Sequence, residues 1–169
     1  MARGFSLVER LVVVAVFGLM MSLAVPNLQR LLASRQVLAA AQAFVRDMAW
    51  ARSEALKRSM RIGICTSVNG LVCGNQGWAS GWIVFVDENG NGVLDGSDEL
   101  LRVQAALGVA SMASSNPVND HLQFVFQSQG VARSAAQSLM VTTSDQQRLV
   151  CVSMQGRAAL RPAGDLQCN

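Results

Sequence analysis

Residues 87–98 carry the side chains of this chain that are best suited to bind a metal ion. They match the calcium-loop pattern D-x-[DN]-x-[DN]-G-x5-acid, with aspartate in place of the usual glutamate at the last position. The oxygen-bearing residues are Asp87, Asn89, Asn91, Asp95 and Asp98. An EF-hand loop lies between helices, however, and β-type runs flank this one. Two successive Asn-Gly pairs are also a strong hairpin signal, so calcium loop and plain hairpin turn both stay open, and we prefer the hairpin.

Catalytic motifs are absent from the sequence. It contains no Gly-x-Ser-x-Gly elbow, no His-Glu-x-x-His zinc site and no Gly-x-x-x-x-Gly-Lys phosphate loop. The single histidine, His121, has no evident nucleophile to serve, and we place it at the edge of a loop or strand. Trp50, Trp78 and Trp82 are expected to pack in the core or on a sheet. We therefore expect no enzymatic activity and no catalytic residue.

The N-terminal segment combines a single carboxylate with a long apolar run. Gly4 precedes the uncharged residues 11–29, whereas a secretory signal has its small-residue cleavage site after the apolar core. Cleavage after Gly4 would therefore leave the hydrophobic helix on the mature protein. Glu9 lies near the start of the apolar segment, where inserting an ionisable group into lipid costs about 2.5–3.5 kcal/mol. We interpret Glu9 as a functional group that requires a partner.

Two helical segments must position Glu9 and join it to the rest of the chain. Residues 5–29 are long enough to cross a hydrocarbon core of about 30 Å. Residues 30–61 continue as an amphipathic helix whose apolar residues recur at three- and four-residue steps. Its apolar stripe consists of Val37, Ala41, Phe44, Met48, Ala51 and Ala55. Together the two segments are predicted to form one rod that bends at Pro26.

The remaining residues, 62–169, are predicted to form a β-rich head. Short β-type runs are punctuated there by Gly, Asn, Asp and Ser. The runs cover residues 61–65, 82–86, 100–103, 122–126, 138–142 and 149–152. Residues 108–120 are rich in Ala, Ser and Asn and are predicted to be a loop. The fold class is therefore α+β, in which an antiparallel sheet covers the helix.

The N-terminal sequence resembles the class III signal of type IV pilins and of the pseudopilins of type II secretion. The resemblance rests on Gly4-Phe5-Ser6-Leu7-Val8-Glu9 and on the helix that follows, with Gly18 and Pro26. It implies that a prepilin peptidase removes residues 1–4 and that the amine of Phe5 is N-methylated. It also implies that Glu9 pairs with the N-terminal amine of a neighbouring subunit. Arg10 departs from the pattern, which has an apolar residue there, and it could neutralise Glu9 within one chain.

Motifs in the head narrow the resemblance to the GspH/FimT branch of pseudopilins and minor pilins. They are the Cys65 to Cys73 spacing, Gly81-Trp82-Ile83-Val84-Phe85-Val86-Asp87, Phe126-Gln127-Ser128-Gln129-Gly130 and the ending Cys151…Gly156-Arg157…Cys168. The resemblance implies a single-pass protein of the bacterial inner membrane with a cytoplasmic N-terminus and a periplasmic head, which enters a pilus or pseudopilus. The implied partners are prepilin peptidase, the inner membrane and other pilins or pseudopilins.

Three functions stay open within this branch. We expect a structural minor pilin that assembles at or near the tip of a type IV pilus and primes its assembly, with a possible contribution to DNA uptake. The two short cysteine loops are the argument for a pilus. A type II secretion pseudopilin that supports protein export is one alternative. A dedicated DNA-binding receptor of natural transformation is the other.

The DNA alternative depends on arginines near the C-terminus. Some members of the branch carry Gly-Arg-x-Arg there and contact DNA through it. Gly156 and Arg157 match this motif, but the next arginine, Arg161, comes two residues late. Arginine suits phosphate because its planar guanidinium donates two hydrogen bonds at once. Arg133 and Arg148 would extend the patch if the fold brought them near; ordinary surface arginines are the other interpretation.

The four cysteines indicate an oxidising compartment. Because their number is even and they form two close pairs, we expect the disulfides Cys65–Cys73 and Cys151–Cys168 on the periplasmic side. Neither pair has the Cys-x-x-Cys spacing of a zinc ribbon or a redox motif. Apart from the calcium considered above, no cofactor is expected.

The positive charge of the chain is concentrated in the amphipathic helix. Residues 30–61 include seven basic and two acidic side chains, whereas residues 62–169 include five basic and eight acidic ones. This bias is compatible with anionic lipid, nucleic acid or acidic partner subunits. A helix face that is simply solvated is the interpretation that we slightly prefer.

Overall fold

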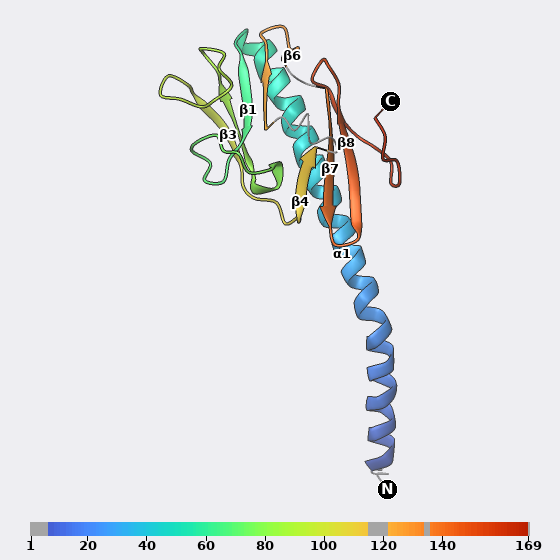
Figure 1. Ribbon diagram of the computed structural model, residues 1–169. Helices are drawn as coiled ribbons and strands as arrows, with labels where there is room; N and C mark the ends of the chain where they lie inside the picture. The colour runs from blue at the N-terminus through green and yellow to red at the C-terminus, as the bar shows by residue number, and fades with distance from the viewer. Residues whose placement is uncertain (1–6, 115–121, 134–135, 169) are drawn as a thin grey trace.

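A single uninterrupted helix organises the computed structural model, which describes residues 7–114, 122–133 and 136–168 (Figure 1). Helix α1 spans Leu7–Arg58 and continues through Pro26. Its N-terminal half projects from the head as a stalk. The predicted continuous helix is therefore confirmed, although it ends before residue 61, because Ser59 adopts a left-handed conformation with φ of 55°.

Two antiparallel sheets cover the C-terminal half of α1, where the sequence predicted one. Sheet A has the order β3 (Leu100–Gln104), β2 (Trp82–Val86), β1 (Ile62–Thr66), β5 (Gln123–Phe126) and β6 (Ala132–Arg133). Sheet B has the order β4 (Ser111–Ser114), β7 (Gln137–Thr143), β8 (Gln146–Val152) and β9 (Ala158–Leu160). A short 3-10 turn, η1 (Trp78–Ser80), precedes β2. The α+β class is confirmed, with the helix packed on two sheets rather than on one.

Strand β4 lies within residues 108–120, so the prediction that this whole segment is a loop was wrong. The four residues of β4 have little intrinsic preference for a strand. They are extended because Ser111 pairs with Thr142 of β7 and because Met112 is buried in the core. The short strands β6 and β9 were not predicted either, because they have only two and three residues, and each is extended by pairing with the strand that precedes it, β5 or β8.

The core forms where the apolar stripe of α1 meets both sheets. Val37, Ala41, Phe44, Met48, Ala51 and Ala55 are all buried, as predicted. The ring of Phe44 lies 5.0 Å from that of Trp78 and 5.5 Å from that of Trp82, both edge to face. Such pairs contribute about 0.5–1.5 kcal/mol beyond the area that they bury. Trp78 and Trp82 are therefore core residues, as expected.

A buried carboxylate fixes the position of α1 against sheet A. Asp47 is 1% exposed and accepts hydrogen bonds from Nε1 of Trp82 (3.0 Å) and Nη1 of Arg102 (2.6 Å). The guanidinium of Arg102 also lies 4.7 Å from the ring centre of Trp50. A buried charge is tolerated only when its partners are in place. One turn of the helix is therefore tied to two strands of the sheet.

The outer face of sheet A has a small core of its own. Cys65, Ile83 and Phe85 are buried there, and Cys73 and Leu94 pack against them. The Cys65–Cys73 disulfide closes one covering loop, and residues 87–99 form the other. The amide of Leu94 donates a hydrogen bond to Sγ of Cys73 at 3.3 Å. The two loops therefore cover the sheet as one unit.

Gly156 joins the edge of sheet B to the edge of sheet A. Its φ is +75°, and a Cβ there would lie 2.5 Å from Cβ of Ala132 and 2.6 Å from the ring of Phe126. Both the backbone conformation and the space therefore require glycine.

Replacing Asp47 by alanine should lower the free energy of unfolding by about 2–4 kcal/mol, because the buried indole N–H of Trp82 and the guanidinium of Arg102 lose their acceptor. Urea unfolding of the detergent-solubilised full chain, followed by tryptophan fluorescence, measures this. Arg35→Ala is the matched control, since Arg35 is exposed on the same helix and should change stability by less than about 0.5 kcal/mol. Equal effects of the two variants would contradict the role given to Asp47.

Replacing Gly156 by alanine should destabilise the head by more than about 2 kcal/mol, because the new methyl group overlaps Ala132 in a left-handed backbone. The same urea titration applies. Gly96→Ala is the control, since nothing lies within 4 Å of its Cβ position, and it should be neutral or slightly stabilising. A neutral Gly156→Ala variant would mean that the two sheet edges are not in contact.

Candidate functional site

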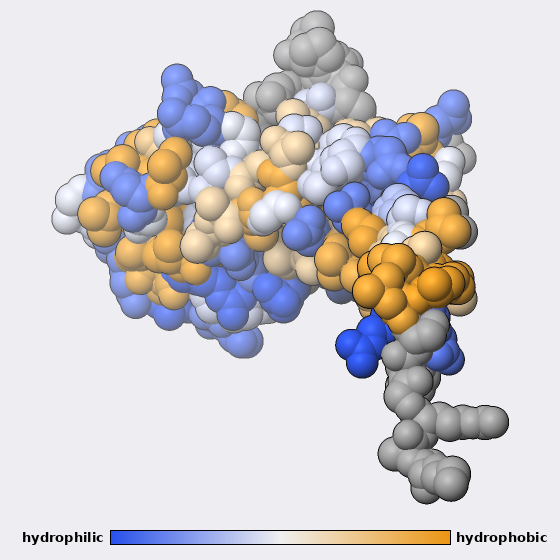
Figure 2. Space-filling view, turned by 90° about the horizontal axis from the view of Figure 1, so that it is seen from below, coloured by the Kyte–Doolittle hydropathy of each residue, from blue (hydrophilic) through white to orange (hydrophobic). Residues whose placement is uncertain are grey.

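The N-terminal half of α1 is an apolar surface that the described head does not cover. Every large apolar side chain described between Leu7 and Leu32 is 45–74% exposed. In the described part of the chain, α1 is the one helix long and apolar enough to cross a membrane. Figure 2, seen from this end, shows apolar side chains gathered around the helix. Such a surface requires lipid or other helices around it.

Glu9 lies in the first turn of the described helix, and both it and Arg10 are exposed. The helix places this carboxylate at the end of the apolar surface that is farthest from the head (Figure 1). Gly4 and Phe5 lie outside the described residues, so leader cleavage and N-methylation stay predictions. His121 also lies outside them.

Arg157 and Arg161 lie at the two ends of the edge strand β9. Between them, Ala158 and Leu160 pack against the main core. Because side chains alternate along a strand, Arg157, Ala159 and Arg161 share the outer face of sheet B. There they line a shallow pocket of about 330 Å³ together with the disulfide-bonded Cys151 and Cys168. Arg161 comes two residues later than the second arginine of the Gly-Arg-x-Arg motif, and this even shift leaves Arg157 and Arg161 on the same face of sheet B.

Arg133 and Arg148 have different relations to this surface. Arg133 is exposed and follows Ala132, which faces Gly156, the residue before Arg157. Arg148 shares its face of β8 with Val150 and Val152, which are buried against the core. The structure thus places Arg148 on the opposite face of sheet B, whereas it is Ala132, the neighbour of Arg133, that contacts Gly156.

The oxygens of the candidate calcium loop hydrogen-bond within the loop. Asp87 is buried and accepts from the amides of Gly90 (2.8 Å) and Gly92 (3.0 Å). Asp98 accepts from the amides of Glu88 and Asp95, both at 3.0 Å. The side-chain amides of Asn89 and Asn91 donate to Asp95 at 2.7 and 3.0 Å.

This arrangement agrees with a hairpin connection, since β2 and β3 pair antiparallel on either side of residues 87–99. The connection is much longer than a two-residue turn. Among the described residues, no group of three or more His, Cys, Asp or Glu side chains is placed to hold a metal ion. Calcium binding by Asp87, Asn89, Asn91, Asp95 and Asp98 stays an untested prediction.

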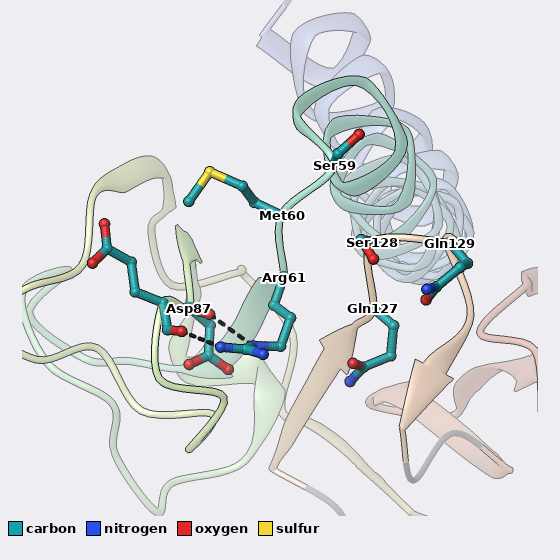
Figure 3. Close-up of a pocket in the computed structure, with 8 residues that line it drawn as sticks. Ser59, Met60, Arg61, Asp87, Gln127, Ser128 and Gln129 are labelled. Carbon is teal, nitrogen blue, oxygen red and sulfur yellow. Dashed lines mark hydrogen bonds between the residues drawn. The ribbon is translucent and has the colours of Figure 1, made fainter.

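A polar pocket of about 280 Å³ lies where the end of α1 meets this loop and the turn after β5 (Figure 3). Nε of Arg61 donates to the carbonyl oxygen of Asp87 at 3.2 Å, and Nη2 donates to that of Glu88. Ser128 and Gln129 line the pocket from the turn. The guanidinium of Arg61 is thus used to hold the loop to the end of the helix.

Sequence reasoning missed the structural parts played by Asp47, Arg61 and Arg102, which it counted only as charges. One signal was present for Asp47, which follows Phe44 by three residues and adjoins Met48 on the apolar stripe. A carboxylate in that position needs a buried partner. Nothing local indicated that Arg102 would supply it from a strand 55 residues away.

Comparisons with known proteins point in one direction. The chain matches the family model described as type II transport protein GspH over residues 40–156. It is 29% identical over 163 residues to the pilin-like protein PilA1 of Thermus thermophilus, covering 94% of this chain and 97% of that relative.

The fold is similar to that of the type IV minor pilin FimU of Pseudomonas aeruginosa PAO1. One crystal form gives a TM-score of 0.60 at 18% identity, covering 78% of this chain and 92% of FimU. A second crystal form gives a TM-score of 0.57 at 18% identity, covering 76% and 94%. The shared feature is one long N-terminal helix packed on antiparallel sheets. Since the family model spans more than half of the chain, this protein belongs to the GspH family and is a pilin-like protein of the GspH/FimT branch.

Proposed function

We propose that this protein is a minor pilin that enters a type IV pilus at or near its tip and helps to start assembly. The observation that carries the proposal is the exposed apolar half of α1 with Glu9 at its far end. The family and this helix fit a membrane-anchored pilus component. The family and its fold are those of structural pilins rather than of enzymes.

The helix explains how such a subunit would leave the membrane. Lipid covers its apolar side chains before assembly, and fully burying one Val, Leu or Phe contributes about 1.5–3 kcal/mol. Extraction is favourable only if helices of neighbouring subunits replace the lipid. Glu9 favours one arrangement of the helices that replace the lipid, because a carboxylate in apolar surroundings is stabilised by an opposite charge. The N-terminal amine of a neighbour, at Phe5 after leader removal, supplies that charge.

The names of the similar proteins favour a type IV pilus over a type II secretion system. FimU is named a type IV minor pilin and PilA1 a pilin-like protein. The family description refers to type II transport instead, so a secretion pseudopilin is the alternative. Deletion of the gene distinguishes them: we expect fewer pili with protein export intact, and the opposite result would favour the pseudopilin.

Replacing Glu9 by valine should remove the protein from filaments while leaving it in the membrane, because the helix keeps its apolar surface and loses the charge that pairs with a neighbour. The measurement is an immunoblot of sheared pili against the membrane fraction, in which the sheared-to-membrane ratio should fall at least about tenfold, corresponding to about 1.4 kcal/mol.

Two controls accompany this test. Glu9→Asp keeps the charge and should retain part of the incorporation, and Glu88→Val removes an exposed carboxylate from the head without touching the helix. Normal incorporation of Glu9→Val into pili would overturn the assembly role of Glu9.

DNA binding is a second candidate function, which the shared outer face of Arg157 and Arg161 supports. Arg133, on the adjoining edge of sheet A, would add a third cation. Each guanidinium can bind one phosphate of a duplex, so the affinity would be weak and would fall as salt rises.

Replacing Arg157 by glutamine should weaken binding of duplex DNA by the full chain in detergent and reduce the salt dependence by about one phosphate contact. Fluorescence anisotropy over a salt series measures both. Arg148→Gln is the matched control, because Arg148 lies on the opposite face of sheet B. Equal losses in the two variants, or no binding by the parent chain, would remove the DNA role.

A further inference from the structure

A pocket of about 320 Å³ lies at the base of the head, where helix α1 leaves the cover of the sheets. Its helix side is formed by Pro26, Gln29, Arg30 and Ala33. Because these positions are three and four residues apart, they share one face of the helix. The same face continues into the buried stripe, since Ala33 is the first buried residue of the described helix and Val37 follows it one turn later. The pocket therefore lies directly below the head, on the side of the helix that packs on the sheets.

The turn between β7 and β8 forms the other wall of the pocket. Strand β7 ends at Thr143, which pairs with Gln146 at the start of β8, so the turn consists of Ser144 and Asp145. Both turn residues line the pocket. Figure 1 shows the turn at the end of the head nearest the stalk, beside α1. The pairing of β7 with β8 therefore fixes the place of Asp145 over the helix.

Arg30 and Asp145 carry opposite charges into this pocket. Nε of Arg30 lies 3.7 Å from Oδ2 of Asp145, and the two side chains are 69% and 58% exposed. This distance is longer than that of an N–H···O hydrogen bond. Exposed ion pairs also contribute little to stability. The guanidinium and the carboxylate can therefore each take up a ligand group without destabilising the head.

The charged residues of the stalk place the pocket at the surface of a membrane. Residues 11–29 are uncharged, and Arg30 follows Arg10 by 20 residues. This separation corresponds to about 30 Å of helix, which is the thickness of the hydrocarbon core of a bilayer. When Arg10 lies at one surface, Arg30 therefore lies at the other, where the long side chain of arginine extends its charge toward the headgroups.

The pair of opposite charges matches one class of lipid headgroup. A phosphate accepts two hydrogen bonds at once from the planar guanidinium of Arg30. A primary ammonium donates to the carboxylate of Asp145. Phosphatidylethanolamine carries both groups. Phosphatidylglycerol has no cation for Asp145, and the quaternary ammonium of phosphatidylcholine has no N–H to donate.

We propose that the pocket between α1 and the β7–β8 turn binds the headgroup of phosphatidylethanolamine, with the phosphate at Arg30 and the ammonium at Asp145. The inference rests on the proposed function, in which the chain is anchored in the membrane before it assembles. Because the lipid contacts both the helix and the turn of sheet B, it fixes the depth of the stalk and the rotation of the head over the membrane. Extraction into a filament releases the lipid.

The test counts the lipids that the full chain retains in native mass spectrometry. The chain is purified in detergent and titrated with the dioleoyl forms of phosphatidylethanolamine, phosphatidylglycerol and phosphatidylcholine, so that only the headgroup differs. We expect phosphatidylethanolamine to be retained several-fold more than either other lipid. Equal retention of all these lipids would overturn the inference, because Arg30 and Asp145 would then only mark the surface of the bilayer.

Substitutions separate the two parts of the headgroup. Arg30→Gln should lower the retention of phosphatidylethanolamine and of phosphatidylglycerol several-fold, since both bind through a phosphate. Asp145→Asn should lower only that of phosphatidylethanolamine, because the acceptor of its ammonium becomes an uncharged amide. Both residues are exposed, so the variants should fold, and urea titration of tryptophan fluorescence verifies this.

Arg35→Gln is the matched control, since Arg35 is an exposed arginine of the same helix outside the residues that line the pocket. It should leave the retention of every lipid unchanged. A loss as large as that of Arg30→Gln would contradict the site, because any cation of the helix would then serve. An Asp145→Asn variant that keeps the full preference for ethanolamine would contradict the contact assigned to Asp145.

Lipid retention is measured without filaments, so the two proposals can fail separately. If the lipid preference is absent while Glu9→Val still removes the chain from sheared pili, the lipid site is wrong and the assembly role stands. If the preference is present while the parent chain is absent from pili, the proposed function is wrong and the lipid site remains that of a membrane-anchored protein.

Discussion

Helix α1 is buried against the head over one half and exposed over the other, and the rest of the structure depends on how the head holds it. From Ala33 to Ala55 the buried side of α1 is covered by two sheets, whereas the large apolar side chains described from Leu7 to Leu32 are exposed. The head therefore has to hold the helix firmly at one end. The hydrogen bonds from Trp82 and Arg102 to the buried Asp47 set the axial and rotational position of the helix, because a displaced carboxylate would lose both partners in a dry interior.

The position of the helix determines which surfaces remain for other molecules. Sheets A and B occupy the buried side of α1, and Gly156 closes the gap between their edges. Among the described residues, the opposite side of the helix is exposed, as at Arg35, Gln42 and Lys57. The two disulfides lie at the outer faces of the sheets, where they fix loops rather than the core. The head thus presents one side of the helix, the acidic residues 87–99 and the arginine-bearing edge of sheet B.

These surfaces suit a protein whose work is assembly. The GspH family and the fold shared with FimU belong to pilin-like proteins, and in the proposed function the apolar half of α1 supplies most of the binding free energy. Non-directional apolar burial does not by itself choose one rotation of neighbouring subunits.

The sequence by itself determined the elements whose signals are local. The 3.6-residue periodicity predicted α1 and its six buried stripe residues, alternating apolar runs predicted the longer strands, and close cysteine spacing predicted both disulfides present in the structure. Only the tertiary structure decided the two-sheet arrangement, the strand β4, the partners of Asp47 and the separation of Arg148 from Arg157. The reason is physical: these features depend on which distant segments pair, and pairing is set by long-range packing that no local pattern encodes.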